Sequence, residues 1–303
     1  MVDGAASLGD AGLELPRQRS GRGSLRIFAR NRSALFGAII TAAFLLTGSA
    51  GLVMIGFSSL HHLYLDQNLS QALSQPLEHG PFGTDPLGRD LLARVVAGIG
   101  VSLAIAAIVT ALSLLVGGIV GILAGFYGGR IDALLSGVID ITWGFPVILV
   151  IVILAGVLSP GLSTVVFGIA LINWAGFARI IRGEVMVLRE QDFVRAALAL
   201  GASPLRIMVR HLAPNVIAPT LVMGSYYVAI TIIAEAGTSF IGVGAQPPTP
   251  SLGQIISDGQ NYLTRDVWVV AIPGAVLALI VLGLNAFGDG LRDFVDPRLR
   301  TRG

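Results

Sequence analysis

The sequence predicts an all-α polytopic membrane protein with six transmembrane helices. Hydrophobic residues make up 54% of its 303 residues and charged residues only 13%, about half of the roughly 25% usual in soluble domains. A helix needs about 20 mostly apolar residues to cross the hydrocarbon core of a bilayer. Runs of that kind place the expected spans at 34–57, 101–126, 135–158, 162–177, 216–236 and 267–287.

The third and fourth spans come from one long apolar run. Between Asp132 and Arg179 the only charged residue is Asp140, and the run is too long for a single helix. A Ser-Pro-Gly sequence at 159–161 interrupts it. Proline lacks an amide donor and glycine favours turns, so we expect two spans joined by a tight turn.

The arginines predict the orientation of these spans. All twenty basic residues are arginine, and with the N-terminus inside, seventeen of them fall in inner segments. Only Arg89, Arg94 and Arg265 fall outside. Short cytoplasmic loops are enriched in basic residues, so both termini are predicted to be cytoplasmic. The first span begins well after the N-terminus and lacks a convincing small-residue cleavage site, so we expect it to be retained in the membrane.

Composition also excludes several classes of function. The chain contains no lysine, which a phosphate-binding loop of the GxxxxGK[ST] kind requires. It contains no cysteine, and therefore no disulfide and no thiolate metal site. Adjacent His61 and His62 alone do not complete a metal site. No pattern resembles a catalytic triad, a paired-carboxylate site or a helix that reads nucleic acid, so we expect no catalytic residue, no metal and no nucleic-acid partner.

The most informative segment is a polar region from Arg179 to Asn215, set among the apolar runs. It carries six arginines, has helix-forming residues around Ala196, and is interrupted at Gly201. Ser203 and Pro204 then follow in the order typical of an N-cap and a first helical residue. A helix, a break and a second helix in an inner loop predict a docking site for a soluble partner.

Four segments in order carry a resemblance to a known family. They are the polar region, PFGTDPLGRD at 81–90, GAQPPTPSLG at 244–253 and GDGLRDFVDPRLR at 288–300. Together they resemble the inner-membrane permease subunits of ATP-binding-cassette (ABC) importers of the dipeptide, oligopeptide and nickel group, in particular the C-type subunit. The residues that match the EAA loop of this family are Arg195, Ala196, Ala197, Gly201, His211, Pro214 and Asn215. Arg195 departs from the glutamate of the motif.

The resemblance implies a type I ABC importer transmembrane domain with several partners. A homologous permease subunit would complete the pore as a heterodimer, and cytoplasmic ATP-binding subunits would bind ATP and Mg. An extracytoplasmic solute-binding protein would deliver peptides to this subunit in the bacterial plasma (inner) membrane. The chain itself would hold no cofactor. Nickel or another small solute is an alternative cargo. A self-sufficient carrier or membrane enzyme is a further alternative, which would need polar residues clustered at mid-membrane.

The chain divides into four expected regions. Residues 1–24 are polar and rich in Gly and Ser, which favours a disordered cytoplasmic tail. Residues 25–100 hold the first span and a long outer loop, and 101–290 hold five helices with the coupling loop at 185–215. Residues 291–303 form a cytoplasmic C-terminal tail. A later outer loop at 237–266, rich in Gly and Pro, either re-enters the membrane or faces a partner.

Two carboxylates within the spans are candidates for function, because charges inside a membrane are energetically costly. Asp140 lies near the cytoplasmic end of its span, where it either forms a salt bridge with a nearby arginine or lines the path. Glu235 lies near the outer end of the fifth span. It faces the pore, binds a peptide amine or packs against the partner subunit.

Three glycines of the second span, Gly117, Gly121 and Gly125, recur at four-residue spacing. Small residues at this spacing let two helices approach closely. They predict a helix–helix seam, either within the chain or with a partner subunit, although glycine is also simply common in membrane helices.

Overall fold

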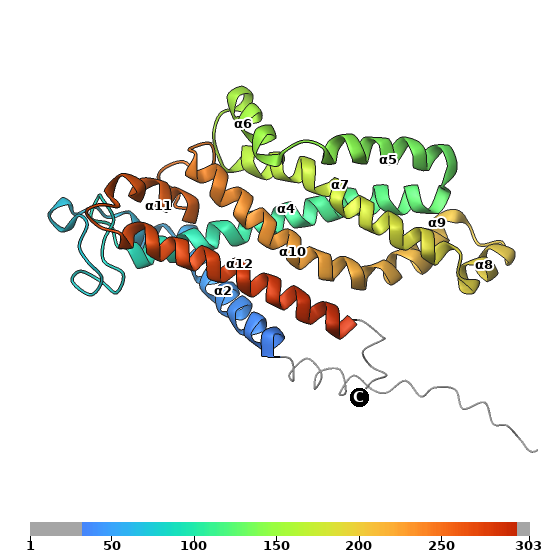
Figure 1. Ribbon diagram of the computed structural model, residues 1–303, viewed down its shortest axis with the longest axis horizontal. Coiled ribbons are helices and arrows are strands. Elements are labelled where there is room, and N and C mark those ends of the chain that lie inside the picture. Colours follow the sequence, from blue (N-terminus) through green and yellow to red (C-terminus); the bar gives the residue numbers. More distant parts are fainter. Residues whose placement is uncertain (1–31, 296–303) are drawn as a thin grey trace, which may run out of the picture.

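The computed structural model of the chain describes residues 32–295, so the predicted tail 1–24 and residues 296–303 lie outside the described residues. The described part is a bundle of helices without a named strand (Figure 1). Its long helices are α2 (Arg32–Gly56), α4 (Leu91–Tyr127), α7 (Leu162–Arg189), α10 (Ala213–Phe240) and α12 (Trp268–Val295). These five are long and apolar enough to cross a membrane. Their positions match five of the six expected spans.

The span expected at 135–158 is bent and is not one continuous helix. It falls on two helices, α5 (Gly129–Trp143) and α6 (Val147–Leu158), which meet at an angle of 80°. The count rises to six spans only if this bent pair is one broken span. The cause is Pro146, which occupies the N-cap of α6 and sterically disfavours helical geometry at the residue before it.

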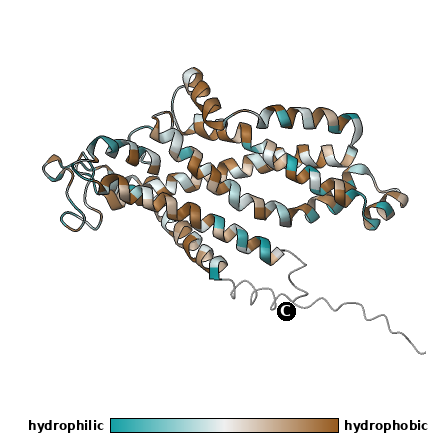
Figure 2. Cartoon of the chain, viewed as in Figure 1, coloured by the Kyte–Doolittle hydropathy of each residue, from teal (hydrophilic) through white to brown (hydrophobic). Residues whose placement is uncertain are grey.

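Several helices extend beyond the apolar runs that identify them. α4 begins at Leu91 rather than at 101, because the side chain of Asp90 caps it by accepting a hydrogen bond from the Ala93 amide at 2.7 Å. α7 continues past the apolar part to Arg189. Helices lengthened in this way carry polar residues beyond the apolar region, and Figure 2 shows hydrophilic residues at the C-terminal end of α12.

The glycine seam lies within the chain, between α4 and α7. A Cβ added at Gly121 would lie 2.7 Å from the carbonyl oxygen of Ala178, and one at Gly125 would lie 2.8 Å from that of Arg182. The two backbones therefore approach too closely for any side chain at these positions. This corrects the alternative in which the glycines contact a partner subunit.

The bundle has two polar ends, which lie on opposite sides of it in Figure 1. The α11 end holds residues 57–90, which include α3 (His62–Leu65), and α11 (Leu252–Gly259). The α8 end holds α8 (Asp192–Ala199) and α9 (Pro204–Ile207). The segment 237–266 folds onto its own chain, because Leu252 and Ile255 of α11 are fully buried in a core cluster shared with α4, α10 and α12.

Candidate functional site in the segment between α7 and α10

The C-terminus of α8 is closed by a capping motif centred on Gly201. The amide of Ala202 donates to the carbonyl of Ala197, and the amide of Gly201 donates to that of Leu198, both at 3.0 Å. These two bonds define a Schellman cap, which requires a left-handed residue after the helix. Gly201 has a φ of +78° and fills that position. The predicted break at Gly201 is therefore a defined backbone turn.

The next helix starts as the sequence predicts, with Ser203 at the N-cap and Pro204 at the first position. α9 continues into a π-helical turn, Met208–Leu212, and then into α10. π-turns are rare, and many occur at functional sites. None of the sequence patterns described above predicts this π-turn.

Three buried side chains anchor this segment to the bundle. Val194 of α8, Ile207 of α9 and Leu212 are fully buried in one cluster with residues of α7 and α10. Burying an aliphatic side chain contributes about 1.5–3 kcal/mol relative to leaving it exposed. The segment is therefore a fixed projection at the α8 end of the bundle.

The opposite side of the projection is exposed and partly apolar. Leu200 is 88% exposed and Leu205 is 68% exposed. Arg195, Ala196 and Gly201 are also exposed. An apolar surface at the polar end of a membrane bundle is typical of a contact with another protein.

Arg195 forms an ion pair inside this segment. Its Nη2 donates to Oε2 of Glu190 at 2.9 Å, and Arg189 Nε lies 3.4 Å from Oε1 of the same carboxylate. The hydrogen bond from Arg195 is the main cause of the lowered pKa of Glu190, and that from Arg189 is the next. Reciprocally, the bond to Glu190 raises the pKa of Arg195. The arginine that replaces the motif glutamate is thus paired with a glutamate at the end of α7.

The second half of the motif lies beside the first. His211 lies in the π-turn, and its ring centroid is 6.5 Å from that of Phe193 in α8. Asn215 donates from Nδ2 to the carbonyl of His211 at 2.6 Å, and Pro214 occupies the first turn of α10. The seven motif residues therefore lie in one continuous segment of 21 positions, which runs from α8 to the first turn of α10.

Asp140 is paired with an arginine of the neighbouring helix. Arg179 of α7 donates from Nη2 to Oδ1 of Asp140 at 2.5 Å, and its guanidinium carbon lies 4.1 Å from the ring centroid of Trp143. Both charged side chains are exposed on the described chain, 43% for Arg179 and 66% for Asp140. The pair joins α5 to α7.

Glu235 is fully buried within its own chain. It accepts hydrogen bonds from Ser102 of α4 at 2.9 Å and from Ser239 at 2.8 Å. Ser239 Oγ in turn accepts a bond from the amide of Ala245 at 3.0 Å. Glu235 therefore links α10, α4 and the segment that follows α10, and it shares no partner with Asp140.

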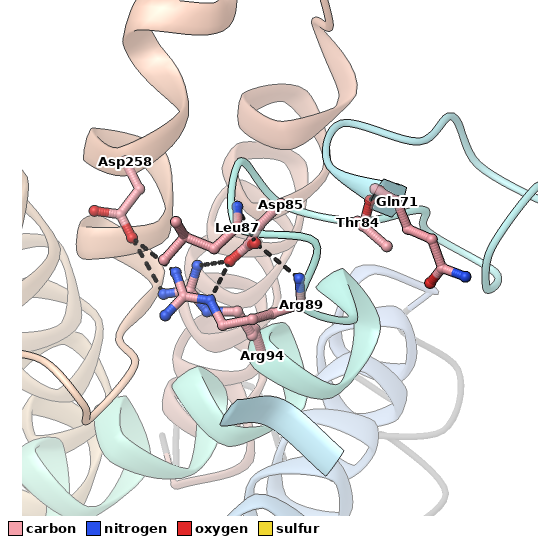
Figure 3. A network of polar contacts seen from close by, with 7 residues as sticks. All are labelled: Gln71, Thr84, Asp85, Leu87, Arg89, Arg94 and Asp258. Atoms are coloured by element: carbon pink, nitrogen blue, oxygen red, sulfur yellow. Dashed lines mark hydrogen bonds and ion pairs between the residues drawn. The ribbon is translucent and has the colours of Figure 1, made fainter. Parts of the chain in front are cut away.

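A further charged network, which the sequence did not predict, lies at the α11 end (Figure 3). Asp85 is fully buried and accepts from Arg89 Nε at 2.6 Å and from Arg94 Nη1 at 2.5 Å. Its other oxygen accepts from the amides of Leu87 and Arg89, at 2.8 and 2.9 Å. Asp258 of α11 lies 3.2 Å from Arg94 Nη2 and 3.7 Å from Arg89 Nη2.

The partners in this network explain why sequence alone missed it. Arg94 and Asp258 are 164 positions apart, so no local spacing connects them. The sequence offers one indication of this network. Arg89 and Arg94 fall on the side of the membrane where the arginine count predicts few arginines. No group of three His, Asp or Glu side chains suited to a metal ion occurs among residues 32–295.

Comparison with known proteins identifies the family. The family described as "Binding-protein-dependent transport system inner membrane component" matches residues 117–301. A dipeptide transport system permease protein of Alkalihalophilus pseudofirmus is 35% identical over 92% of this chain and 90% of its own. A putative peptide transport system permease protein of Brucella suis is 44% identical over 75% of this chain and 76% of its own.

A solved structure supports the same fold. The chain resembles the inward-facing MetNI methionine ABC transporter with a TM-score of 0.55, over 66% of this chain and 96% of that one, at 18% identity. The described helices and this likeness agree with a type I ABC importer transmembrane domain. The chain belongs to the family of binding-protein-dependent transport system inner membrane components, and it is a permease subunit of an ABC importer rather than an enzyme.

Proposed function

We propose that this subunit forms half of a translocation pathway for peptides and couples it to ATP hydrolysis on other chains. A homologous permease subunit forms the other half as a heterodimer. Cytoplasmic ATPase subunits bind ATP and Mg, and an extracytoplasmic solute-binding protein delivers the cargo. The names of the relatives support peptides over nickel as the cargo. The two relatives described above are named for dipeptides and for peptides, and a Bacillus subtilis relative, 35% identical to this chain, is named for oligopeptides.

The orientation of the subunit in the bacterial plasma membrane is part of this proposal. The α8 end is cytoplasmic, together with both termini, and the α11 end faces outward. The arginine bias supports it, because Arg130, Arg189, Arg195, Arg206 and Arg210 all belong to the segments at or next to the α8 end. The basic residues on this side also favour contact with the phosphates of membrane lipids.

The observation that carries the coupling role is the projection formed by α8 and α9. It is anchored in the bundle by Val194, Ile207 and Leu212 and presents exposed Leu200 and Leu205. A rigid element joined directly to α7 and α10 transmits movement of a docked ATPase to two membrane helices. This coupling element lies within residues 185–215 and is formed by Arg195, Ala196, Ala197, Gly201, His211, Pro214 and Asn215.

Substitution of Leu200 by aspartate tests the docking surface. A charge at the centre of an apolar contact is expensive to bury, so Leu200→Asp should reduce both co-purification of the ATPase subunits and peptide uptake. Leu77→Asp is the matched control, because Leu77 is 86% exposed at the opposite end of the bundle, against 88% for Leu200. Equal effects of the two substitutions, or none at Leu200, would reject the assignment.

A further inference from the structure

A pocket with a volume of about 740 Å³ lies at the α11 end of the described chain. Volumes of about 300–1,000 Å³ are usual for sites of small ligands. Its walls come from the 57–90 segment, the start of α4, the loop between α10 and α11 that contains Pro247 and Pro248, and α11. Charged residues Arg89, Arg94 and Asp258 line the pocket, as does Gln254.

The two aspartates of the network hold the arginines very differently. Asp85 is fully buried and makes bonds of 2.6 and 2.5 Å to them, together with two backbone amides. Asp258 is 36% exposed and its contacts are 3.2 and 3.7 Å. Asp85 is thus a fixed counter-ion, whereas Asp258 is a loosely held carboxylate at the pocket wall.

Gln254 provides an independent sign of an incomplete site. It lies one turn before Asp258 on the same face of α11 and lines the same pocket. Its side chain is more than nine-tenths buried, and its Oε1 accepts no hydrogen bond. A buried acceptor without a donor is energetically unfavourable, so a turn of the Gln254 amide that brings Oε1 to an N–H of a ligand in the pocket is favoured.

We propose that this pocket binds the C-terminal end of a short peptide, whose carboxylate replaces Asp258 on Arg89 and Arg94. Arginine pairs are well suited to carboxylates, because the guanidinium presents several donors in a fixed fork. The peptide N–H that precedes the terminal carboxylate then donates to Gln254 Oε1. The proposal assigns a ligand site on the importer subunit itself, and it rests on the outward orientation and peptide cargo of the proposed function.

The site is tested with the full chain in lipid nanodiscs. Because the chain contains no cysteine, Asn261→Cys places one thiol at an exposed pocket residue, and the rate of its modification by a maleimide reports occupancy. Glycylglycine should slow the modification in a saturable way. Glycylglycinamide, which lacks the carboxylate, should not, and acetate should protect more weakly because it has no N–H for Gln254.

Asp258→Asn gives the result that separates this site from a merely structural network. Removing the competing carboxylate should tighten glycylglycine binding about two- to fivefold, the range expected from an exposed ion pair. Arg89→Gln should weaken it about tenfold or more, since a hydrogen bond to a charged group is lost. Gln254→Met should reduce the affinity for glycylglycine and leave that for acetate unchanged. Asp66→Asn removes an exposed carboxylate of the same end outside the network and should change nothing.

Three outcomes would overturn the proposal. They are equal protection by glycylglycinamide, weaker or unchanged binding in Asp258→Asn, and protection by the cognate solute-binding protein with none by glycylglycine. The last would assign the pocket to an acidic side chain of that protein. None of these measurements needs ATP or the ATPase subunits. If glycylglycine does not protect the thiol but the importer takes up peptide normally, only the pocket proposal is rejected. Normal uptake in Leu200→Asp, in contrast, rejects only the coupling proposal.

Discussion

The amide of Ala202 donates to the carbonyl of Ala197 at 3.0 Å, across the end of α8. This bond reverses the chain between α8 and α9 and brings both alanines against the same core cluster. It forms only because Gly201, between them, has a positive φ. The geometry of the projection formed by α8 and α9 therefore depends on one residue without a side chain.

Gly201→Val is expected to uncouple ATP hydrolysis from uptake while the chain still inserts in the membrane. No atom lies within 4 Å of a Cβ built at Gly201, so the effect comes from the backbone and not from a clash. A left-handed conformation is unfavourable for a residue with a side chain by about 1–2 kcal/mol. The measurement is peptide uptake per ATP hydrolysed in vesicles that contain the whole importer.

Gly201→Asn serves as the control, because asparagine enters the left-handed region more readily than other residues with side chains. It should retain most of the coupling. Normal coupling in Gly201→Val would contradict the role of this turn.

The orientation predicts which introduced cysteines react from outside. Gln246 and Arg195 are both exposed, at the α11 end and the α8 end respectively. On intact cells an impermeant thiol reagent should modify Gln246→Cys and spare Arg195→Cys. After permeabilisation both should react, which controls for the reactivity of position 195. Modification of position 195 on intact cells would reverse the proposed topology.

The ion pair between Glu190 and Arg195 predicts a pH dependence. The pKa of Glu190 is lowered in the folded chain, chiefly by the hydrogen bond from Arg195. Its contribution to stability is therefore present above the unfolded-state pKa, about 4.3 for glutamate, and is lost as the pH falls through the folded-state pKa. Arg195→Gln should lower the melting temperature slightly at pH 7, and this difference should shrink as the pH falls below about 4. A difference that is constant with pH would mean that Arg195 acts through other contacts.

Much of the fold is predictable from the sequence, because membrane spans depend on long apolar runs. Five spans lie where such runs predict them, and the Gly201 break and the Ser203–Pro204 helix start follow from local backbone chemistry. The bend before Pro146 could also have been predicted, since a Trp-Gly-Phe-Pro sequence disfavours a continuous helix. The prediction of spans missed this bend because it relied on hydropathy, which carries no information on helix geometry.

The contacts of buried charges were not predictable in the same way. Glu235 meets Ser102 across 133 positions, and Arg94 meets Asp258 across 164. No periodicity joins such distant residues, because packing of whole helices brings them together. The sequence thus indicates that an intramembrane carboxylate needs a partner, and only the structure shows that Glu235 finds it within its own chain.

The two aspartates at the α11 end should differ strongly in their effect on stability. Asp85→Asn removes the counter-ion of buried Arg94, and loss of one partner of a buried pair destabilises by about 3–5 kcal/mol. Asp258→Asn breaks only longer, partly exposed contacts, worth about 0.2–1 kcal/mol. Thermal unfolding in detergent, together with proteolysis of the 57–90 segment, measures both. Similar losses in the two variants would contradict the distinction between a fixed and a loosely held carboxylate.

The loop between α10 and α11 is expected to act in docking of the solute-binding protein. Pro247, Pro248 and Pro250 each restrict φ, and Gln246 donates from Nε2 to the carbonyls of Gly242 and Gly244 at 3.0 and 3.2 Å. The loop is thus held in shape before a partner arrives, which lowers the ordering free energy of association.

Replacing these three prolines with glycine should reduce the ATPase activity stimulated by the binding protein more than the basal activity. The flexible loop must be ordered at each docking event, whereas hydrolysis without the binding protein does not involve it. ATPase assays of the reconstituted importer, with and without the binding protein, measure the two activities. Pro160→Gly, in the connection between α6 and α7, provides a control at a different loop. Equal loss of both activities would instead indicate that the 237–266 segment, whose α11 is buried against α4, α10 and α12, serves assembly of the subunit.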